Sequence, residues 1–233
     1  PGCAPLRAHT VYQQIEPDQP GTGARTLSFC DPDDLAALVR DVQRARQQAD
    51  CVIVSMHWGI HMTEAVIADY QRQAARAAID AGAAAILGHH AHILKGVEFY
   101  KGAPVFYSLG NFAIEQPHIW DPAIVKTESF RHLVSLNPDF DPQRVYMLPE
   151  AARHTGIARL TIEGDRVTAA AFIPARIDDE SAPQALAPAD AAFKAVHQYL
   201  ERVSHAAGLE VAIAAAGDAL SLAPAPESDL TSV

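Results

Sequence analysis

The chain has 233 residues, of which 49% are hydrophobic, 20% charged and 7% aromatic. This composition is typical of a globular protein and excludes wholesale disorder, collagen-like repeats and coiled coils. The 18 Lys and Arg residues are outnumbered by 28 Asp and Glu residues, and the net charge near −10 provides no basic surface for a phosphate backbone. We therefore expect no nucleic-acid partner. No run approaches the roughly 18 apolar residues of a membrane helix, so we predict no membrane span in this chain.

The length corresponds to about one and a half average domains. We predict an extended lead-in over residues 1–30, a main domain over 31–177, and a C-terminal helix with a flexible tail over 178–233. The three cysteines form neither a disulfide framework nor a CxxC metal site, so the sequence leaves the redox compartment and the localisation open.

The first half of the main domain alternates predicted helices and strands. Asp31 caps a helix, and the apolar run 51–56 then predicts a buried strand. A second helix opens at Thr63 and ends at Gly82, before a buried strand over 84–87. Parallel strands joined by a helix bring their carboxyl ends to one edge of a sheet, which is the usual ligand edge of such sheets.

The second half has an antiparallel pattern. Residues 96–100 and 103–108 predict one hairpin, and residues 157–163 and 166–173 predict another. Residues 115–155 hold several prolines without a clear period and predict a long irregular insertion that could cover a site. The remaining predictions are a helix over 189–203 and a frayed end from about Ser221.

Histidines follow both predicted buried strands. His57 comes after the first strand, and His89, His90 and His92 come after the second. Neutral imidazole is the commonest protein ligand of zinc, manganese and iron, and residues two apart in an extended turn point to the same side. A lone histidine at a strand end is usually half-exposed and hydrogen-bonded to backbone. Four histidines at one predicted sheet edge instead favour a metal site.

The remaining histidines give weaker signals. His57 and His61 have the spacing of a helical zinc pair, but the Glu of that motif is absent and Gly59 lies between them, so we do not expect a metalloprotease helix. We assign three further histidines to solvated loops: His118, His132 and His154.

Four motifs together resemble a known family. They are Val54–Gly59, Asp80–Ala83, Gly88–His92 and Val105–Phe112. Their order and distances are similar to those of the CapA family of poly-gamma-glutamate capsule-synthesis proteins, within the calcineurin-like metallophosphatase superfamily. The resemblance covers about residues 31 to 115.

The resemblance implies an α/β (α+β) fold, namely a calcineurin-like β-sandwich flanked by helices, with two divalent ions (Mn, Zn or Fe) at one sheet edge. By that resemblance the metal ligands are His57, His90 and His92, the catalytic proton donor or supporting residue is His89, and the substrate-binding residues are His61 and Asn111. His61 stands where the family commonly has Glu.

The superfamily also carries an upstream aspartate motif and an Asn-His motif, which supply about half of the two-metal shell. Neither motif occurs in this sequence. Residues 1–7 are similar to a mid-chain segment of the family, so we predict that the chain is the C-terminal part of a longer protein and lacks the N-terminal part of the fold.

Three functions are compatible with these patterns. The first is a metal-dependent phosphoesterase-like hydrolase linked to poly-gamma-glutamate or capsule synthesis, acting on an anionic small molecule or polymer. The second is a non-catalytic polymer-binding or assembly component with capsule-synthesis partners. The third is a metal-dependent amide hydrolase, because a metal-bound water attacks carbonyl carbon as well as phosphorus. Members of the family are often associated with the cell envelope.

Overall fold

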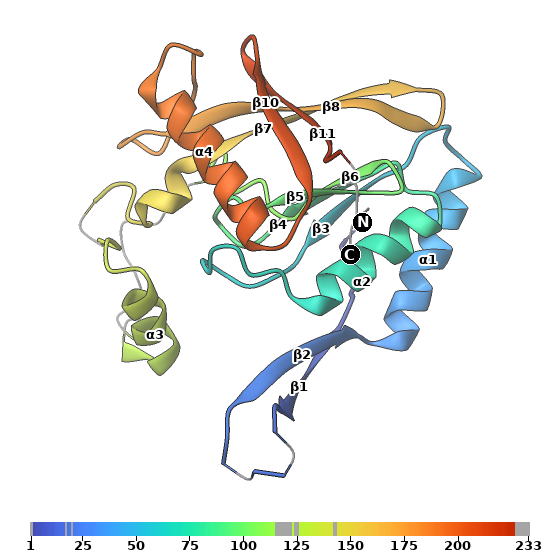
Figure 1. Ribbon diagram of the computed structural model, residues 1–233, viewed down its shortest axis with the longest axis horizontal. Helices are drawn as coiled ribbons and strands as arrows, with labels where there is room; N and C mark the ends of the chain where they lie inside the picture. The colour runs from blue at the N-terminus through green and yellow to red at the C-terminus, as the bar shows by residue number, and fades with distance from the viewer. Residues whose placement is uncertain are drawn as a thin grey trace, which may run out of the picture.

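The structure, a computed structural model, describes residues 2–16, 18–19, 21–114, 123, 126–141 and 144–226. Within these ranges the chain forms a mixed α/β fold with a two-stranded, a four-stranded and a five-stranded sheet and four α-helices (Figure 1). The predicted α+β class is confirmed. None of the helices in the described part of the chain is both long and apolar enough to cross a membrane.

The four-stranded sheet carries the predicted parallel core. Its elements and the helices between them are α1 (Pro32–Arg46), β3 (Ile53–His57), α2 (Asp69–Asp80), β4 (Ala85–His89), β5 (Val97–Tyr100) and β6 (Ala103–Phe106). The strand order is β3-β4-β6-β5, with β4 parallel to both neighbours and β5 antiparallel to β6. The β5–β6 hairpin turns at Lys101 and Gly102, which both have positive φ, as expected for a tight hairpin turn.

The five-stranded sheet comes from the C-terminal half. Its strands and the helix between them are β7 (His154–Glu163), β8 (Arg166–Ile177), β9 (Pro183–Ala185), α4 (Ala191–Ala206), β10 (Val211–Ala216) and β11 (Ala219–Pro224). The order is β10-β11-β8-β7, and β9 also pairs with β8. The predicted hairpin over 157–173 and the predicted C-terminal helix are both confirmed, with longer bounds.

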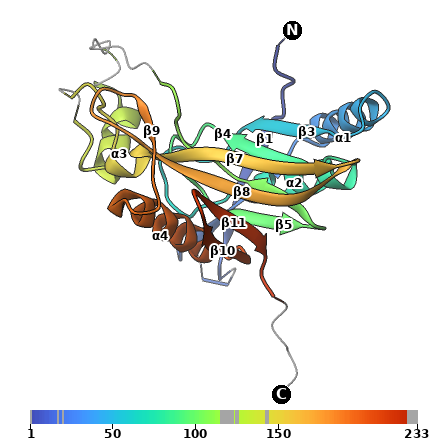
Figure 2. The same ribbon diagram turned by 90° about the horizontal axis from the view of Figure 1, so that it is seen from above.

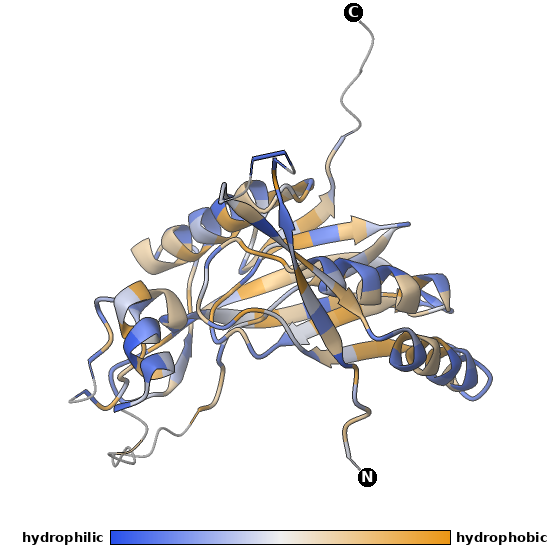
Figure 3. Cartoon of the chain, turned by 90° about the horizontal axis from the view of Figure 1, so that it is seen from below, coloured by the Kyte–Doolittle hydropathy of each residue, from blue (hydrophilic) through white to orange (hydrophobic). Residues whose placement is uncertain are grey.

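The core lies on both faces of the four-stranded sheet. On one face, Met56 and Ile86 pack with Val42 of α1 and Ala78 of α2. On the other, the second sheet and α4 pack through a cluster of buried side chains that includes Val97, Phe106, Phe172, Leu200 and Leu220. The two larger sheets therefore face each other, with α1 and α2 outside the first (Figure 1). Figure 3 shows hydrophobic residues along the central strands, whereas the helices alternate hydrophobic and hydrophilic residues.

Residues 8–30 fold differently from the extended lead-in that the sequence predicts. They form an antiparallel hairpin of β1 (Ala8–Gln14) and β2 (Ala24–Cys30), which projects from the body of the molecule (Figure 1). Its residues alternate weakly because most of both faces is exposed to solvent, so no buried face imposes the alternation that identifies a strand.

The second helix begins later than predicted. α2 starts at Asp69 rather than at Thr63, and the Gln71 side chain accepts a hydrogen bond from the Ala68 N–H at its start. Residues 61–66 instead form a loop in which Met62 and Ala65 have positive φ. Helical periodicity in the sequence therefore overestimates the helix, because tertiary contacts of the loop override it.

Two further predictions are wrong. The segment 115–155 is not irregular throughout, because it contains α3 (Glu128–Leu136), capped by Thr127, and a 3₁₀ turn over Glu150–Arg153. Figure 2 shows α3 beyond one end of β7 and β8. The C-terminal end does not fray at Ser221, because β11 pairs there with both β10 and β8. The sequence pattern fails here because the end of β11, which contains Ser, Ala and Pro, has weak intrinsic β-propensity and depends on its neighbours.

Candidate functional site

The pairing of β3 with β4 places the predicted histidines at one sheet edge. The parallel register pairs His57 with His89, and the Trp58 N–H donates to the His89 carbonyl at 3.2 Å. Both histidine-bearing loops therefore leave the sheet on the same side, as predicted.

The strand ends are packed closely beneath these loops. A Cβ on Gly88 would lie 2.2 Å from the Tyr107 carbonyl oxygen and 2.6 Å from Nε1 of Trp58. That indole nitrogen donates to the same carbonyl at 3.0 Å. Only glycine fits at this position, because the β4 backbone and the Trp58 side chain approach each other without room for a side chain between them.

Four imidazole rings gather above this edge. The ring centroids of His57 and His90 are 4.7 Å apart, and His61 lies 5.8 Å from His90 and 4.9 Å from His92. The closest polar contact joins Nε2 of His57 to Nδ1 of His90 at 3.0 Å. His90 and His92 are 6.4 Å apart. The structure therefore brings His57, His61, His90 and His92 together.

The backbone at this loop adopts conformations that L-residues rarely occupy. His90 has φ +91° and His92 has φ +57°. Positive φ in residues other than glycine costs conformational energy and persists where the surroundings fix it, which is commonest at functional sites.

Asn111 lies beside His92 and contacts it twice. Its Oδ1 is 2.5 Å from Nδ1 of His92, and its Nδ2 donates to the His92 carbonyl at 3.2 Å. The substrate-binding role of Asn111 stays a prediction. The contacts observed here are with His92, which is one of the predicted metal ligands.

Three of the histidines are held in the neutral form. Burial, and then the neighbouring His92 and His90, lower the pKa of His61 to about 4. Burial also lowers the pKa of His89 and of His90, with His57 as the next cause in both cases. Neutral imidazoles present a lone pair to a cation, so at neutral pH these rings are in the form that binds metals.

The donor set fits part of a metal shell. Ring nitrogens 3.0 Å apart, as in His57 and His90, suit a cation held at about 2.0–2.1 Å from each nitrogen. The contact from Asn111 to Nδ1 of His92 leaves Nε2 of that ring for a ligand, which is the arrangement usual for metal-binding histidines. In the described part of the chain, no group of three or more His, Cys, Asp or Glu side chains is placed to hold an ion together.

Other histidines lie away from this cluster. His118 is outside the described residues, and His132 is exposed on α3. His154, which we assigned to a solvated loop, is instead the partly buried first residue of β7, with its ring 4.8 Å from that of Tyr199. The strand pairing that buries it could not be read from the aperiodic sequence around it.

Sequence reasoning missed three polar residues that support the site. Buried Lys95 donates from Nζ to the carbonyls of Thr63 and Val66, and thereby holds the loop that carries His61. Buried Tyr146 accepts a hydrogen bond from Asn111 Nδ2 at 3.2 Å. The Thr155 hydroxyl contacts the Asn111 carbonyl. Lys95 closely follows the histidine motif and could have been found there, but nothing in the sequence pattern marks the other two.

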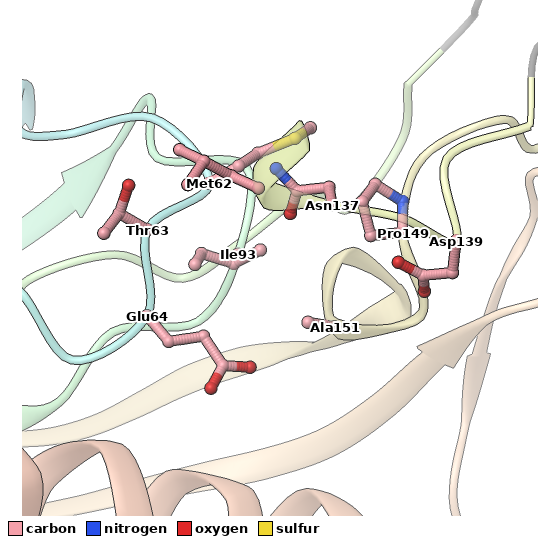
Figure 4. Close-up of a pocket in the computed structure, with 9 residues that line it drawn as sticks. Met62, Thr63, Glu64, Ile93, Asn137, Asp139, Pro149 and Ala151 are labelled. Atoms are coloured by element: carbon pink, nitrogen blue, oxygen red, sulfur yellow. The ribbon is translucent and has the colours of Figure 1, made fainter. Parts of the chain in front are cut away.

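A cavity of about 440 Å³ lies beside the histidine loops (Figure 4). It lies between Met62 and Ile93, which directly follow His61 and His92, and the segment that includes Asn137 and Pro149. Met62 and Ile93 also belong to a buried hydrophobic cluster that includes Tyr146 and Leu148. The described part of the 115–155 segment therefore packs against the loops that carry the histidines.

The comparisons with known proteins cover this half of the molecule. The family profile of the bacterial capsule synthesis protein PGA_cap matches residues 4–116, which include β1 to β6 and all of the candidate site histidines. The PGA biosynthesis protein CapA of Bacillus subtilis (strain 168) is 45% identical over 85 residues. Residues 4–116 are therefore a CapA-family region.

Further similarity supports this assignment of the matched region. The capsule biosynthesis protein CapA of Bacillus anthracis is 38% identical over 126 residues, which are 46% of this chain and 29% of that protein. A probable polyglutamine synthesis accessory protein of Mycobacterium tuberculosis (strain ATCC 25618 / H37Rv) is 37% identical over 79 residues, 34% of this chain and 20% of the relative. The B. subtilis alignment covers 36% of this chain and 22% of that CapA. The chain thus spans less than a third of these curated CapA relatives.

Proposed function

We propose that this chain carries the histidine half of a metal-dependent phosphoesterase-like centre that serves the synthesis of a poly-gamma-glutamate capsule. The observation that carries the proposal is the convergence of His57 and His90, whose ring nitrogens lie 3.0 Å apart although the residues are 33 positions apart in the sequence. The CapA-family region supports the link to capsule synthesis.

In this proposal His57, His90 and His92 would hold divalent metal, which when bound polarises phosphoryl oxygens and supplies a hydroxide nucleophile. Residues of this chain position the rings and keep them unprotonated. The close-packed Gly88 and Trp58 fix the strand ends beneath the rings. Asn111 orients His92, and burial keeps His90 unprotonated.

His89 is the candidate proton donor for the leaving oxygen. Because burial lowers its pKa, the ring is largely neutral at neutral pH, and the fraction able to donate a proton increases as the pH falls. Activity that depends on His89 as a proton donor should therefore fall as the pH rises.

The proposal is tested by hydrolysis of a chromogenic phosphomonoester by the natural full-length protein, with Mn²⁺ or Zn²⁺ and with a chelator. We expect chelator-sensitive hydrolysis that falls by a factor of about 10²–10⁴ in a His89→Gln variant, since that is the usual contribution of general acid–base catalysis. The matched control is His205→Gln, because His205 is exposed near the end of α4. Hydrolysis that is indifferent to the chelator would refute the metal role.

A second candidate, a non-catalytic component that binds an anionic polymer, is favoured by one observation. Within the described ranges no three His, Cys, Asp or Glu side chains form a metal-holding group. The accessory role in the name of the mycobacterial relative points the same way. Binding of polyglutamate by the full-length protein, together with no turnover of phosphoesters or of the polymer amide under any metal, would favour this candidate over both hydrolase functions.

A further inference from the structure

A chain of buried hydrogen bonds connects His92 to a segment outside the matched family region. Tyr146 lies 30 residues beyond the end of that region, and its hydroxyl is within hydrogen-bond distance of both Asn111 Nδ2, at 3.2 Å, and the Ala152 carbonyl, at 2.5 Å. Asn111 in turn contacts His92. Tyr146 is 1% exposed and Asn111 6% exposed, so water does not replace these contacts.

The direction of each hydrogen bond in this chain is fixed by counting protons. The Tyr146 hydroxyl has one proton, and the Ala152 carbonyl can only accept it. The tyrosine oxygen must therefore accept from Asn111, which places the amide NH₂ toward Tyr146 and toward the His92 carbonyl. The amide oxygen then faces Nδ1 of His92, and that nitrogen must carry the proton.

The surroundings hold the chain of contacts in place. Burial raises the pKa of Tyr146 to about 12, so its hydroxyl keeps its proton at neutral pH. The Arg153 guanidinium stacks 4.6 Å from the centroid of the same ring. On the other side, the Thr155 hydroxyl of β7 contacts the Asn111 carbonyl. The amide is thus fixed by the second sheet and by the 144–153 segment together.

We propose that Tyr146 is a positioning residue that acts through Asn111 to hold His92 in the tautomer protonated on Nδ1, with the lone pair on Nε2. The selection of tautomer stands on the contacts alone. Its use, which is to present Nε2 to a cation, rests on the proposed function. By this route the C-terminal half of the chain controls a ring that belongs to the family motif.

The consequence of removing the hydroxyl follows from the amide geometry. In Tyr146→Phe the Asn111 NH₂ loses one of its two acceptors, so that only the His92 carbonyl still opposes a half-turn rotation of the amide. The rotated amide presents its NH₂ to Nδ1 of His92, and this favours the tautomer protonated on Nε2. That tautomer has no lone pair on Nε2, so metal binding through this nitrogen weakens.

The test is ¹⁵N NMR of the imidazole rings in the metal-free protein, because the nitrogen shifts separate a protonated from an unprotonated ring nitrogen. We expect wild-type His92 to be protonated on Nδ1, and Tyr146→Phe to give a mixture of both tautomers. The control is Tyr107→Phe, which also removes a buried tyrosine hydroxyl, here one bonded to Glu98 at 2.7 Å. This control should leave the His92 signals unchanged.

Two results would overturn the proposal. One is a wild-type His92 protonated on Nε2, a measurement that needs no variant to fold. The other is a folded Tyr146→Phe protein with the wild-type His92 pattern, which would make Tyr146 only structural.

Zinc titration of the same proteins separates this proposal from the proposed function. We expect Tyr146→Phe to bind about 10–100-fold more weakly than wild type, as is usual when the partner of a ligating histidine is disturbed. A wild-type protein that binds no zinc but has the expected tautomer would refute the metal function and leave the positioning role of Tyr146 supported.

Discussion

At the scale of single residues, the strand end beneath the histidines is packed so closely that Gly88 has no room for a side chain. Gly88 lies in β4 directly before His89, and an added Cβ would overlap the Tyr107 and Phe106 carbonyls and the Trp58 indole. Two of these three contacts are with backbone, which cannot move without disturbing the pairing of β4 with β6.

We therefore predict that Gly88→Ala lowers the free energy of unfolding by more than about 3 kcal/mol, as overpacking against fixed backbone does at its upper range. Denaturant unfolding measures this change. Gly23→Ala is the control, since its added Cβ would meet only Ile15 at an ordinary 3.9 Å, and its effect should stay below about 0.5 kcal/mol. Equal stability of the two variants would contradict the packing described at the strand ends.

His61 gives the stability of the protein a defined pH dependence. Its pKa is about 4 in the folded protein, mainly because of burial, and has its ordinary value of 6.5 in the unfolded chain. Between these values the unfolded chain binds a proton that the folded protein does not. This contribution to stability is therefore intact above about pH 6.5 and is lost as the pH falls toward 4.

We expect the loss to be about 1–2 kcal/mol, less than the full linkage value because the ring is partly exposed. Urea unfolding of wild type and His61→Gln at pH 7 and pH 5 measures it. The variant should lose less stability on acidification than wild type, whereas His205→Gln should behave like wild type. If all three proteins show the same pH dependence, the folded protein does not hold His61 in the neutral form by burial.

At the scale of elements, the loop between β3 and α2 is held from below by one side chain. Lys95 is 2% exposed, and burial lowers its pKa to about 8, yet it still donates to the carbonyls of Thr63 and Val66. The Met62 N–H adds a backbone hydrogen bond to the Ala91 carbonyl at 2.9 Å. These contacts explain why residues 61–66 form a loop although the sequence predicts a helix there.

Lys95→Met should release this loop, because two carbonyls lose their donor. We predict that hydrogen exchange of the amides over 61–68 accelerates by at least about tenfold and that stability falls by about 1–3 kcal/mol. Lys194→Met is the control, since Lys194 is exposed on α4. Unchanged exchange over 61–68 in Lys95→Met would show that the lysine does not hold the loop.

At the scale of the whole molecule, the sequence predicts one half of the site well and the other half poorly. The apolar runs that become β3 and β4, with His57 and His89 at their ends, identify the sheet edge because buried parallel strands are continuously hydrophobic. Tyr146 could not be predicted, because it reaches Asn111 only through tertiary packing of a segment without periodicity. The Ala-rich β10 could not be predicted either, because its pairing with β11 makes it a strand.

The two larger sheets are joined by a common core, so we expect them to unfold together. Phe172 of β8 is 1% exposed and packs in the same cluster as Phe106 of β6. Phe172→Ala should lower the free energy of unfolding by about 3–5 kcal/mol in one cooperative transition. Phe29→Ala, on the exposed hairpin, should change it by less than about 0.5 kcal/mol. Two separate transitions would contradict the shared core.

The convergence of imidazoles from two strand ends on a divalent cation is tested most directly by calorimetric titration of the metal-free protein with Zn²⁺ or Mn²⁺ at pH 7. We predict saturable binding that weakens at least about tenfold in His57→Ala and in His90→Ala and is unchanged in His205→Ala. The proposed metal site would be contradicted by a wild-type protein that binds neither ion. It would also be contradicted by His57→Ala and His90→Ala variants that bind as tightly as wild type.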